Sequence, residues 1–333
     1  MPRISIIMAC HNAEQFVGEA IESVLSQTFT DFELIFIDDC SIDQSLAIAR
    51  SVAKGDVRVK IHANLQNVGA SATRNLAFGL ATGEWLAVLD ADDVFMPTKL
   101  EKQIAAIDNG DPQLVLLGTG CHIIDRNNKI QSIHLYPTSS AALKNRLIGH
   151  VPFPPHSSLM YRASTVKALH GFNVRFSHAE DLDLWLRLRN HGAFACLKEP
   201  LIKYRIHENN ASSFAERKGY IHLDYATAAS VCELLRNQGL LDPSSSKDET
   251  IWNDFLAYIS HQVKLSKMIE YRDWKKSWRS AESMYRPKSV QYLSLLKQAL
   301  IHPFNMLRLM REHIDGNQVA STSFKNWVRK SLQ

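Results

Sequence analysis

The sequence has no apolar run that could cross a membrane, which would take about 18 or more consecutive apolar residues. The opening stretch MPRISIIMACHN also lacks the long apolar segment and the small-residue cleavage site of a secretory signal. We therefore expect a protein of the cytoplasm, either free in that compartment or at the inner face of the cytoplasmic membrane.

Cysteine is scarce and shows no pairing pattern. The 333 residues include five cysteines, an odd number, and none of them forms a CxxC pair. A disulfide framework or a zinc site would need paired or clustered cysteines. The pattern therefore favours scattered, reduced core thiols and disfavours a small disulfide-stapled secreted domain.

Charge is unevenly distributed along the chain. The net charge is +4, but the segment from Lys264 to the end contains 14 Lys and Arg against 5 Asp and Glu. A basic tail on an acidic body indicates contact with an anionic partner, either a membrane surface or a nucleic acid. Because no cluster combines basic and aromatic residues in the way that nucleic-acid modules do, we expect no nucleic acid partner.

The first hundred residues alternate between strand and helix patterns. Compact apolar runs predict strands at 4–8, 32–37, 57–62 and 85–89. Segments with a helical stripe of apolar residues lie between them, at 13–26, 45–53 and 70–81. This alternation predicts an α/β fold, with a Rossmann-like, mostly parallel sheet flanked by helices and ligands bound beyond the carboxyl ends of the strands.

The rest of the chain has a different pattern. Residues 111–215 carry shorter strand patterns at 114–117 and 158–161 and a strong helix pattern at 181–191. From about Gly219 onward the pattern is helical, and we expect helices at 222–238, 251–268, 271–285 and 290–302. We therefore divide the chain into 1–110, 111–215 and a helical C-terminal domain at 216–333.

Polar and acidic side chains follow three of the predicted strands. The stretch LDADDV places Asp90, Asp92 and Asp93 directly after the fourth strand, while Asp39 follows the second and His11 the first. Crowded carboxylates raise one another's pKa unless a cation lies between them. The alternative is an Asp-rich turn that caps the next helix. Because the carboxyl ends of parallel strands meet at one edge of a sheet, we favour a ligand or metal site.

Five ordered motifs carry a family resemblance. They are ISIIMACHN at the start, FIDDCSID at 36–43, NVGASATRN at 67–75, LDADD at 89–93 and HAEDLDLWLRL at 178–188. In this order and spacing they resemble the family 2 inverting glycosyltransferases, which have the GT-A fold. The resemblance ends near residue 210 and leaves out the helical tail. It implies a nucleotide-sugar-binding half at 1–110 and an acceptor-binding half at 111–215.

The resemblance implies a pocket for a nucleotide sugar, usually a UDP-sugar. Asp39 matches the residue that accepts hydrogen bonds from the pyrimidine, and Arg74 matches a position that pairs with phosphate or sugar oxygens. His11 stands where the family usually has a stacking tyrosine, and Ala9 where it has proline or threonine, so dTDP- and GDP-sugars are alternative donors. Without the motifs, His11 would be a turn histidine and Arg74 a helix-surface charge. The expected donor-binding residues are Ala9, His11, Asn12, Asp39, Asn67, Arg74, Asp90 and Ala91.

The same resemblance makes LDADD a metal-binding DxD motif. It implies that Asp92 binds Mn²⁺ or Mg²⁺ directly, with Asp90 near the ribose or metal-bound water, because these cations prefer oxygen ligands. The metal would bridge the diphosphate and take up the charge of the leaving UDP. His207, in the segment YRIH, matches a residue near the diphosphate or metal, and an exposed loop histidine is the alternative. Asp93 is either a ligand or a helix cap.

The resemblance also implies a general base at the start of the helix pattern near residue 181. Asp181 matches the family residue that removes the acceptor hydroxyl proton, so that one direct displacement inverts the sugar. Glu180 is the second candidate. Alternatively, Ser177 and the acidic cluster only cap the helix and interact with its dipole. We expect the acceptor wall near 152–158 and at Phe172.

The predicted function is that of a metal-dependent inverting glycosyltransferase in surface polysaccharide biosynthesis. It would move a hexose or N-acetylhexosamine from a UDP-sugar to a saccharide or lipid-linked saccharide acceptor. A non-catalytic nucleotide-sugar-binding protein is the competing class, and the presence of both Asp92 and Asp181 favours turnover. A nucleotidyltransferase is disfavoured because ACHNAEQF contains no Gly-rich phosphate loop.

The tail contains one amphipathic stretch, YLSLLKQALIHPFNMLRLM at 292–310, with basic residues beside its apolar face. Pro303 interrupts this stretch, so we favour packing on a neighbouring helix or on a second subunit in a homo-oligomer. Peripheral membrane contact is the alternative.

Overall fold

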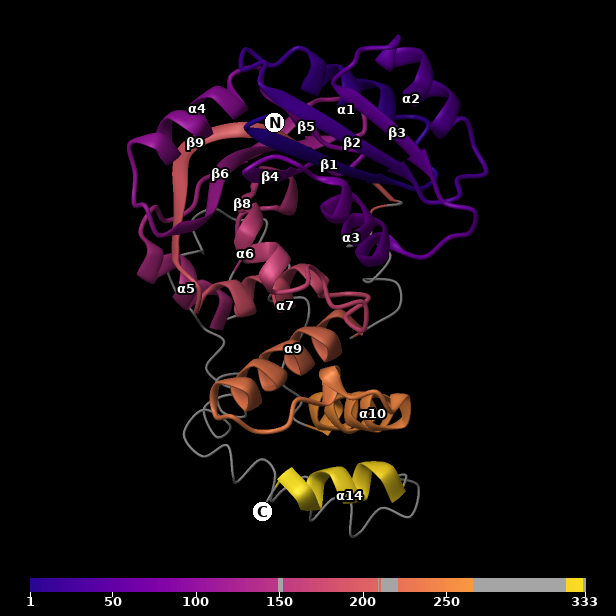
Figure 1. The fold of residues 1–333 in the computed structure, drawn as a ribbon, viewed down its shortest axis with the longest axis vertical. Helices are drawn as coiled ribbons and strands as arrows, with labels where there is room; N and C mark the ends of the chain where they lie inside the picture. Colours follow the sequence, from indigo (N-terminus) through magenta and orange to yellow (C-terminus); the bar gives the residue numbers. More distant parts are fainter. Residues whose placement is uncertain (149–151, 209, 211–220, 266–321, 332–333) are drawn as a thin grey trace. The chain divides into compact units, whose positions relative to one another are not determined.

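The computed structural model describes the chain except for residues 149–151, 209, 211–220, 266–321 and 332–333. The chain divides into two compact units, Met1–Asn210 and Ala211–Gln333. The first unit contains the sheet and all the predicted site residues, whereas the described part of the second unit is helical (Figure 1).

The described strands of the first unit form one nine-stranded sheet in the order β3-β2-β1-β4-β8-β6-β9-β5, with β7 paired to β6. In chain order the strands are β1 Ile4–Cys10, β2 Phe32–Asp38, β3 Val59–Ala63, β4 Trp85–Val88, β5 Val94–Phe95, β6 Leu114–Asp125, β7 Ile130–His134, β8 Met160–Arg162 and β9 Ala193–Ile206. β3, β2, β1 and β4 are parallel, whereas the other pairings are antiparallel except that of β6 with β9. The α/β class predicted from the sequence is confirmed.

The parallel half is built on two almost wholly buried strands, β1 and β2. Helices α1 (Val17–Leu25) and α2 (Ser45–Ala53) lie on one face of the sheet and α3 (Ala70–Leu80) lies on the other (Figure 1). Strands covered on both faces are apolar at successive positions instead of alternating with polar residues. This explains the uninterrupted run FELIFI in β2.

A buried carboxylate fixes the connection that leads into β4. Glu33 of β2 accepts hydrogen bonds from the Ser5 hydroxyl at 2.6 Å, the Thr82 N–H at 2.8 Å and Lys60 Nζ at 2.6 Å. At Gly83 the backbone lies so close to β1 that a Cβ would be 2.5 Å from the Ser5 nitrogen, so a side chain there would force the backbone apart. These contacts hold β4 beside β1 and thereby place the aspartates that follow β4.

The second half of the sheet differs from the sequence prediction. The strand expected at 114–117 continues to Asp125, because it pairs in parallel with β9, a 14-residue strand that the apolar pattern did not predict. β9 also pairs with the short β5. Since β5 directly follows the aspartates, this pairing brings the carboxyl end of β9 to them.

The helices of the first unit follow the predictions with shifted ends. α2 has the predicted bounds, α1 and α3 lie within the predicted segments, and α7 is Glu180–Leu188 instead of 181–191. The strand predicted at 158–161 is Met160–Arg162, preceded by a short 3₁₀ helix. The elements without a specific prediction are α4 Lys99–Asp108, α5 Ser140–Ile148, η1 His156–Ser158 and α6 Ala163–Ala168.

The described part of the second unit consists of α9 Ile221–Asn237, η2 Pro243–Ser245, α10 Glu249–Leu265 and α14 Thr322–Ser331. α9 and α10 agree with the helices predicted at 222–238 and 251–268 to within three residues at each end. The helices predicted at 271–285 and 290–302, and the amphipathic stretch 292–310, lie outside the described residues. Within the described residues, no helix has the length and apolar character needed to span a membrane.

Candidate active site

Hydrogen bonds join the loops after β1 and β2 at the carboxyl edge of the sheet. His11 Nδ1 lies 2.9 Å from the Asp39 carbonyl oxygen, which can only accept, so Nδ1 carries a proton. The Asn12 amide, at 3.0 Å, can then donate to Nε2 of the same ring. Asn12 also accepts from the Ile42 N–H at 2.9 Å, and its own N–H donates to the Ser41 hydroxyl at 3.0 Å. The exposed His11 and Asn12 are therefore held in fixed positions at this edge.

The buried Asp39 carboxylate holds the loop after β3. It accepts hydrogen bonds from the Val68 N–H at 2.9 Å, the Gly69 N–H at 2.8 Å and the Asn64 amide at 2.8 Å. Burial opposes its ionisation, but these donors outweigh burial and hold the pKa of Asp39 below its usual value. The Asn67 amide reaches the Asp39 carbonyl at 3.3 Å. The predicted base-binding residues are thus brought together by Asp39 itself.

Arg74 connects the aspartate motif to the helix that carries the expected base. Its guanidinium donates to Asp90 Oδ1 at 2.7 Å and to Glu180 Oε1 at 3.1 Å. Only 8% of Arg74 is exposed, which excludes the alternative of a helix-surface charge. Burial opposes the ionisation of Asp90, but the Arg74 charge, together with the hydrogen bond from Arg74 and further polar neighbours, outweighs burial and keeps the pKa of Asp90 below its usual value.

Asp92 faces the end of β9. Its Oδ2 accepts a hydrogen bond from His207 Nε2 at 3.0 Å and another from the Asn210 amide at 2.9 Å. The His207 ring packs on Phe16, with 4.8 Å between the ring centroids. His207 is therefore not the exposed loop histidine of the alternative interpretation, because its side chain is only 9% exposed.

Asp93 has a different environment from its two neighbours. It is 1% exposed and accepts hydrogen bonds from the Ser157 hydroxyl at 2.5 Å and the Arg205 N–H at 2.8 Å. Burial, together with the charges of Asp92 and Asp90, raises the pKa of Asp93 well above its usual value. The helix-cap alternative is wrong, because α4 begins only after Thr98. Asp93 instead fastens the aspartate loop to the η1 segment and to β9.

Arg205 holds the aspartate loop in place, a role that the sequence analysis did not assign to it. Its side chain is fully buried, and Nε donates to the Asp92 carbonyl at 2.7 Å while a terminal nitrogen donates to Glu19 Oε2 at 2.7 Å. The guanidinium lies over the Phe16 ring at 4.8 Å. Arg205 therefore fixes the backbone of the aspartate motif against α1.

Glu180 and Asp181 open helix α7 beside this cluster. The Ser177 part of the capping alternative is wrong, because the residue at the N-cap is Ala179 and Ser177 Oγ instead contacts His178 Nδ1 at 2.9 Å. The acidic residues do lie in the first turn of α7, where they can interact with the helix dipole. Burial, followed by the neighbouring Glu180 charge, raises the pKa of Asp181 to about 7. A carboxyl group that titrates near neutral pH is suited to accept a proton as a general base.

His156, in the stretch 152–158 that was expected to form the acceptor wall, is a buried residue of this cluster. It is 8% exposed, and burial followed by the Arg74 charge lowers the pKa of His156 to about 3, so the imidazole is neutral. Its ring packs edge-on against Phe172 at 5.5 Å, and Phe172 stacks on Phe78 at 5.3 Å. Phe172, expected in the acceptor wall, is 3% exposed and lies in this aromatic core beneath Arg74.

The predicted site residues fall into two groups around the carboxyl edge. One group surrounds Asp39 and consists of His11, Asn12 and Asn67. The other surrounds the aspartate motif and consists of Arg74, Asp90, Asp92, Glu180, Asp181 and His207. Two predicted residues, Ala9 and Ala91, have only a methyl side chain and so cannot bind the donor through polar side-chain atoms. Ala91 is 6% exposed, and Ala9 is part of β1.

Asp92 and His207 fit a divalent cation in the chemistry of their donor atoms. Carboxylate oxygens and imidazole nitrogens are both ligands of such cations. In this structure His207 Nε2 donates to Asp92 Oδ2 at 3.0 Å, so among the described residues Asp92 Oδ1 is the carboxylate oxygen that has no hydrogen bond. Asp90 is engaged by Arg74 and Asp93 is buried. In the part of the chain that the structure describes, no group of three or more His, Cys, Asp and Glu could hold a metal alone. The residues therefore fit a metal that arrives with diphosphate oxygens as further ligands.

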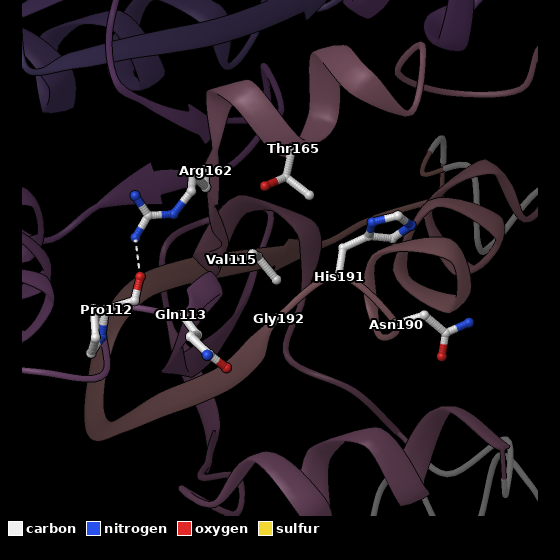
Figure 2. Close-up of a pocket in the computed structure, with 8 residues that line it drawn as sticks. All are labelled: Pro112, Gln113, Val115, Arg162, Thr165, Asn190, His191 and Gly192. Carbon is white, nitrogen blue, oxygen red and sulfur yellow. Dashed lines mark hydrogen bonds between the residues drawn. The ribbon is translucent and has the colours of Figure 1, made fainter.

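An open cavity of about 520 Å³ lies elsewhere in the first unit (Figure 2). It is lined by residues such as Arg162, Thr165 and His191. Arg162 pairs with Trp85, at the amino end of β4, so the cavity is at the opposite edge of the sheet from the aspartates. Arg162 is already engaged there, donating to the Leu114 and Pro112 carbonyls at 2.8 and 3.1 Å.

The chain resembles known proteins in both sequence and fold. The sequence profile of glycosyl transferase family 2 matches residues 5–169. The O-antigen biosynthesis glycosyltransferase WbnJ of Escherichia coli is 33% identical over 222 residues, which are 64% of this chain and 83% of that protein. The chain belongs to glycosyl transferase family 2.

Other relatives of this family 2 glycosyltransferase have more specific descriptions. The UDP-Glc:alpha-D-GlcNAc-diphosphoundecaprenol beta-1,3-glucosyltransferase WfgD of Escherichia coli is 32% identical over 215 residues, covering 63% of this chain and 79% of that protein. Among solved structures, Staphylococcus aureus TarS 1–349 in complex with UDP-GlcNAc is 19% identical with a TM-score of 0.56, covering 78% of this chain and 72% of TarS. At this identity the likeness establishes the fold, which confirms the expected GT-A architecture.

Proposed function

We propose that this glycosyltransferase transfers a hexose or N-acetylhexosamine from a UDP-sugar, with inversion and with a divalent metal, to a saccharide or lipid-linked saccharide in surface polysaccharide biosynthesis. The observation that carries the proposal is the contact of Arg74 with both Asp90 and Glu180. It joins the aspartate motif to the start of α7, so that donor-binding and proton-accepting groups lie at one site.

On the donor side, each group of residues has a separate task. Asp39 and the loop it holds would bind the uracil, with His11 beside the base. Asp92 and His207 would hold Mn²⁺ or Mg²⁺, which when bound neutralises the charge that develops on the leaving UDP. Arg74 provides a buried positive charge for the phosphate or sugar oxygens.

On the acceptor side, Asp181 would take the proton from the attacking hydroxyl. As that oxygen forms its bond to C1 of the sugar, the bond from C1 to the UDP oxygen breaks, and the electron pair leaves with UDP. Because Glu180 is paired with Arg74, it is less available than Asp181 to accept a proton. We therefore assign the base to Asp181 and a charge-balancing role to Glu180.

The relatives support the choice of substrates. WfgD is named for a UDP-glucose donor and a lipid-linked N-acetylglucosamine acceptor, WbnJ for O-antigen biosynthesis, and TarS was crystallised with UDP-GlcNAc. These names favour a UDP-sugar over a dTDP- or GDP-sugar. They also favour an acceptor at the inner face of the cytoplasmic membrane, where lipid-linked glycans are extended.

The test is a panel of nucleotide sugars assayed for slow hydrolysis and for transfer to saccharide acceptors, each with Mn²⁺ and with chelator. We expect one UDP-sugar to be turned over, only when metal is present, and the product to have the inverted anomeric configuration. Turnover of a GDP- or dTDP-sugar alone would contradict the donor assignment. Binding without hydrolysis or transfer in any combination would favour the non-catalytic binding protein.

A further inference from the structure

The last described residue of the first unit, Asn210, makes contacts with both expected metal ligands. Its Nδ2 donates to Asp92 Oδ2 at 2.9 Å and to the Arg205 carbonyl at 3.0 Å. Its Oδ1 accepts a hydrogen bond from the His207 N–H, and its own N–H donates to the His207 carbonyl at 3.3 Å. Both ends of the amide are thus used, and the residue is only 8% exposed.

These contacts determine the orientation of the Asp92 carboxylate group. His207 and Asn210 both donate to Oδ2, and among the described residues no hydrogen bond reaches Oδ1. The other oxygen is therefore left for a ligand. At the same time, the Asn210 side chain closes the turn that follows β9 and so fixes the backbone of His207.

We propose that Asn210 is a positioning residue for the divalent cation that binds with the nucleoside diphosphate, orienting Asp92 and His207 together. This inference rests on the proposed function, because it presumes that these two residues hold the cation. Polar groups that orient metal ligands without touching the metal commonly change metal affinity by about 10- to 100-fold when they are removed.

A purely structural role would use only part of this arrangement. Closing a turn requires the bonds between Asn210 and His207, which are three residues apart. The bond to Asp92 spans 118 positions in the sequence and is not needed for a turn. Measuring metal affinity and stability separately distinguishes the two roles, because the bond to Asp92 can change metal affinity without contributing to the turn.

The experiment compares the full-length protein with Asn210→Ala and Asn210→Ser. The serine hydroxyl can still accept a hydrogen bond near the His207 N–H, but it is too short to keep both amide contacts, so this variant retains more of the turn. Mn²⁺ affinity is measured at saturating UDP from the electron paramagnetic resonance signal of free Mn²⁺. The melting temperature is measured in chelator, without metal.

Asn173→Ala is the matched control, since Asn173 also closes a turn, accepting from the Arg175 N–H at 3.1 Å, and has no hydrogen bond to Asp92 or His207. We expect both Asn210 variants to bind Mn²⁺ about 10- to 100-fold more weakly than the wild type. The Mn²⁺ affinity of the control should stay within about twofold of that of the wild type, whatever melting temperature the control loses. Mn²⁺ affinity within twofold of the wild type for both Asn210 variants would overturn the inference. A wild type that binds UDP but no Mn²⁺ would instead overturn the proposed metal dependence, and this inference with it.

Discussion

At the scale of single residues, the site depends on which two of three neighbouring carboxylates are paired with Arg74. Arg74 pairs with Asp90 and Glu180, whereas the carboxylate of Asp181 has its hydrogen bond from the Leu182 N–H at 2.6 Å. The Arg74 charge favours the ionised form of Asp90, while burial and the Glu180 charge raise the pKa of Asp181 to about 7. One member of the group is thus able to exchange a proton near neutral pH.

Asp181→Asn should abolish this proton exchange while it leaves the donor site intact. We expect the turnover number to fall about 10²- to 10⁴-fold, the usual contribution of a general base, with UDP affinity within about threefold of the wild type. For the wild type, kcat/KM should rise with pH through about 7 as Asp181 loses its proton. Steady-state kinetics across pH 5–9 test this prediction, and an unchanged acidic limb in the variant would assign the base elsewhere.

The same substitution should stabilise the fold above neutral pH. Because the pKa of Asp181 is raised in the folded protein, the folded state binds a proton that the unfolded state has lost between about pH 4 and 7, and stability falls as pH rises through this range. An asparagine at position 181 cannot ionise, so the variant does not lose stability in this way as the pH rises. We expect Asp181→Asn to melt about 2–4 °C above the wild type at pH 8 and to lose this advantage near pH 4. Equal melting temperatures at pH 8 would show that Asp181 is not held in an unfavourable charged state.

The residues that the sequence could identify are those within recognisable motifs. Asp39, Asp92 and Asp181 each stand in a short ordered stretch, and the fold brings those stretches to one edge of the sheet. Asn210 and Arg205 were not predictable, because they act through contacts more than a hundred positions away. Arg205 even binds a backbone carbonyl, which leaves no pattern of residue types in the sequence.

At the scale of elements, the parallel strands of the first half were predictable, whereas the long strand β9 of the mixed second half was not. The strands β1, β2 and β4 are apolar runs between helical stripes. β9 instead carries Lys198, Glu199 and Pro200 in its middle, where its register with β6 shifts, so its sequence resembles a loop. Pairing with β6 decides its conformation, and such tertiary pairing is not visible in a local pattern.

Glu33 should make the stability of the parallel half depend on pH. Burial opposes its ionisation, but the donors Lys60, Ser5 and Thr82 outweigh burial and lower the pKa of Glu33 to about 2. Its contribution to stability is therefore complete above its ordinary pKa of 4.5 and is lost as pH falls toward 2. We expect Glu33→Gln to melt about 3–6 °C below the wild type at pH 7, with the difference narrowing below pH 4.5. Thermal melts at pH 3, 4, 5 and 7 test this, and a constant difference would contradict it.

At the scale of the whole molecule, the predicted site belongs to one unit. Every residue assigned to donor binding, metal binding or proton transfer lies within Met1–Asn210. Residues 211–333 form the second compact unit. The sequence analysis divided the first unit into two halves, whereas both halves contribute strands to a single sheet. Joining the halves places His207 of one beside Asp92 of the other.

A fragment of residues 1–220 should therefore retain the donor site. We expect it to fold and to bind UDP with Mn²⁺ within about threefold of the full-length affinity, because every residue assigned to that site lies within Met1–Asn210. Calorimetric titration of both proteins provides the comparison. Loss of UDP binding by a folded fragment would mean that the second unit completes the donor site.

The most direct measurement titrates UDP into the wild type and into Asp92→Asn, each with Mn²⁺ and with chelator. If Asp92 and His207 hold a metal that arrives with the diphosphate, the wild type should bind UDP at least about tenfold more tightly with Mn²⁺. The reason is that the described residues offer too few metal ligands on their own, so the metal and the diphosphate should bind together. The variant should lose this gain and keep the metal-independent affinity supplied by the Asp39 loop. Equal affinity of the wild type with and without Mn²⁺ would contradict the metal–diphosphate site.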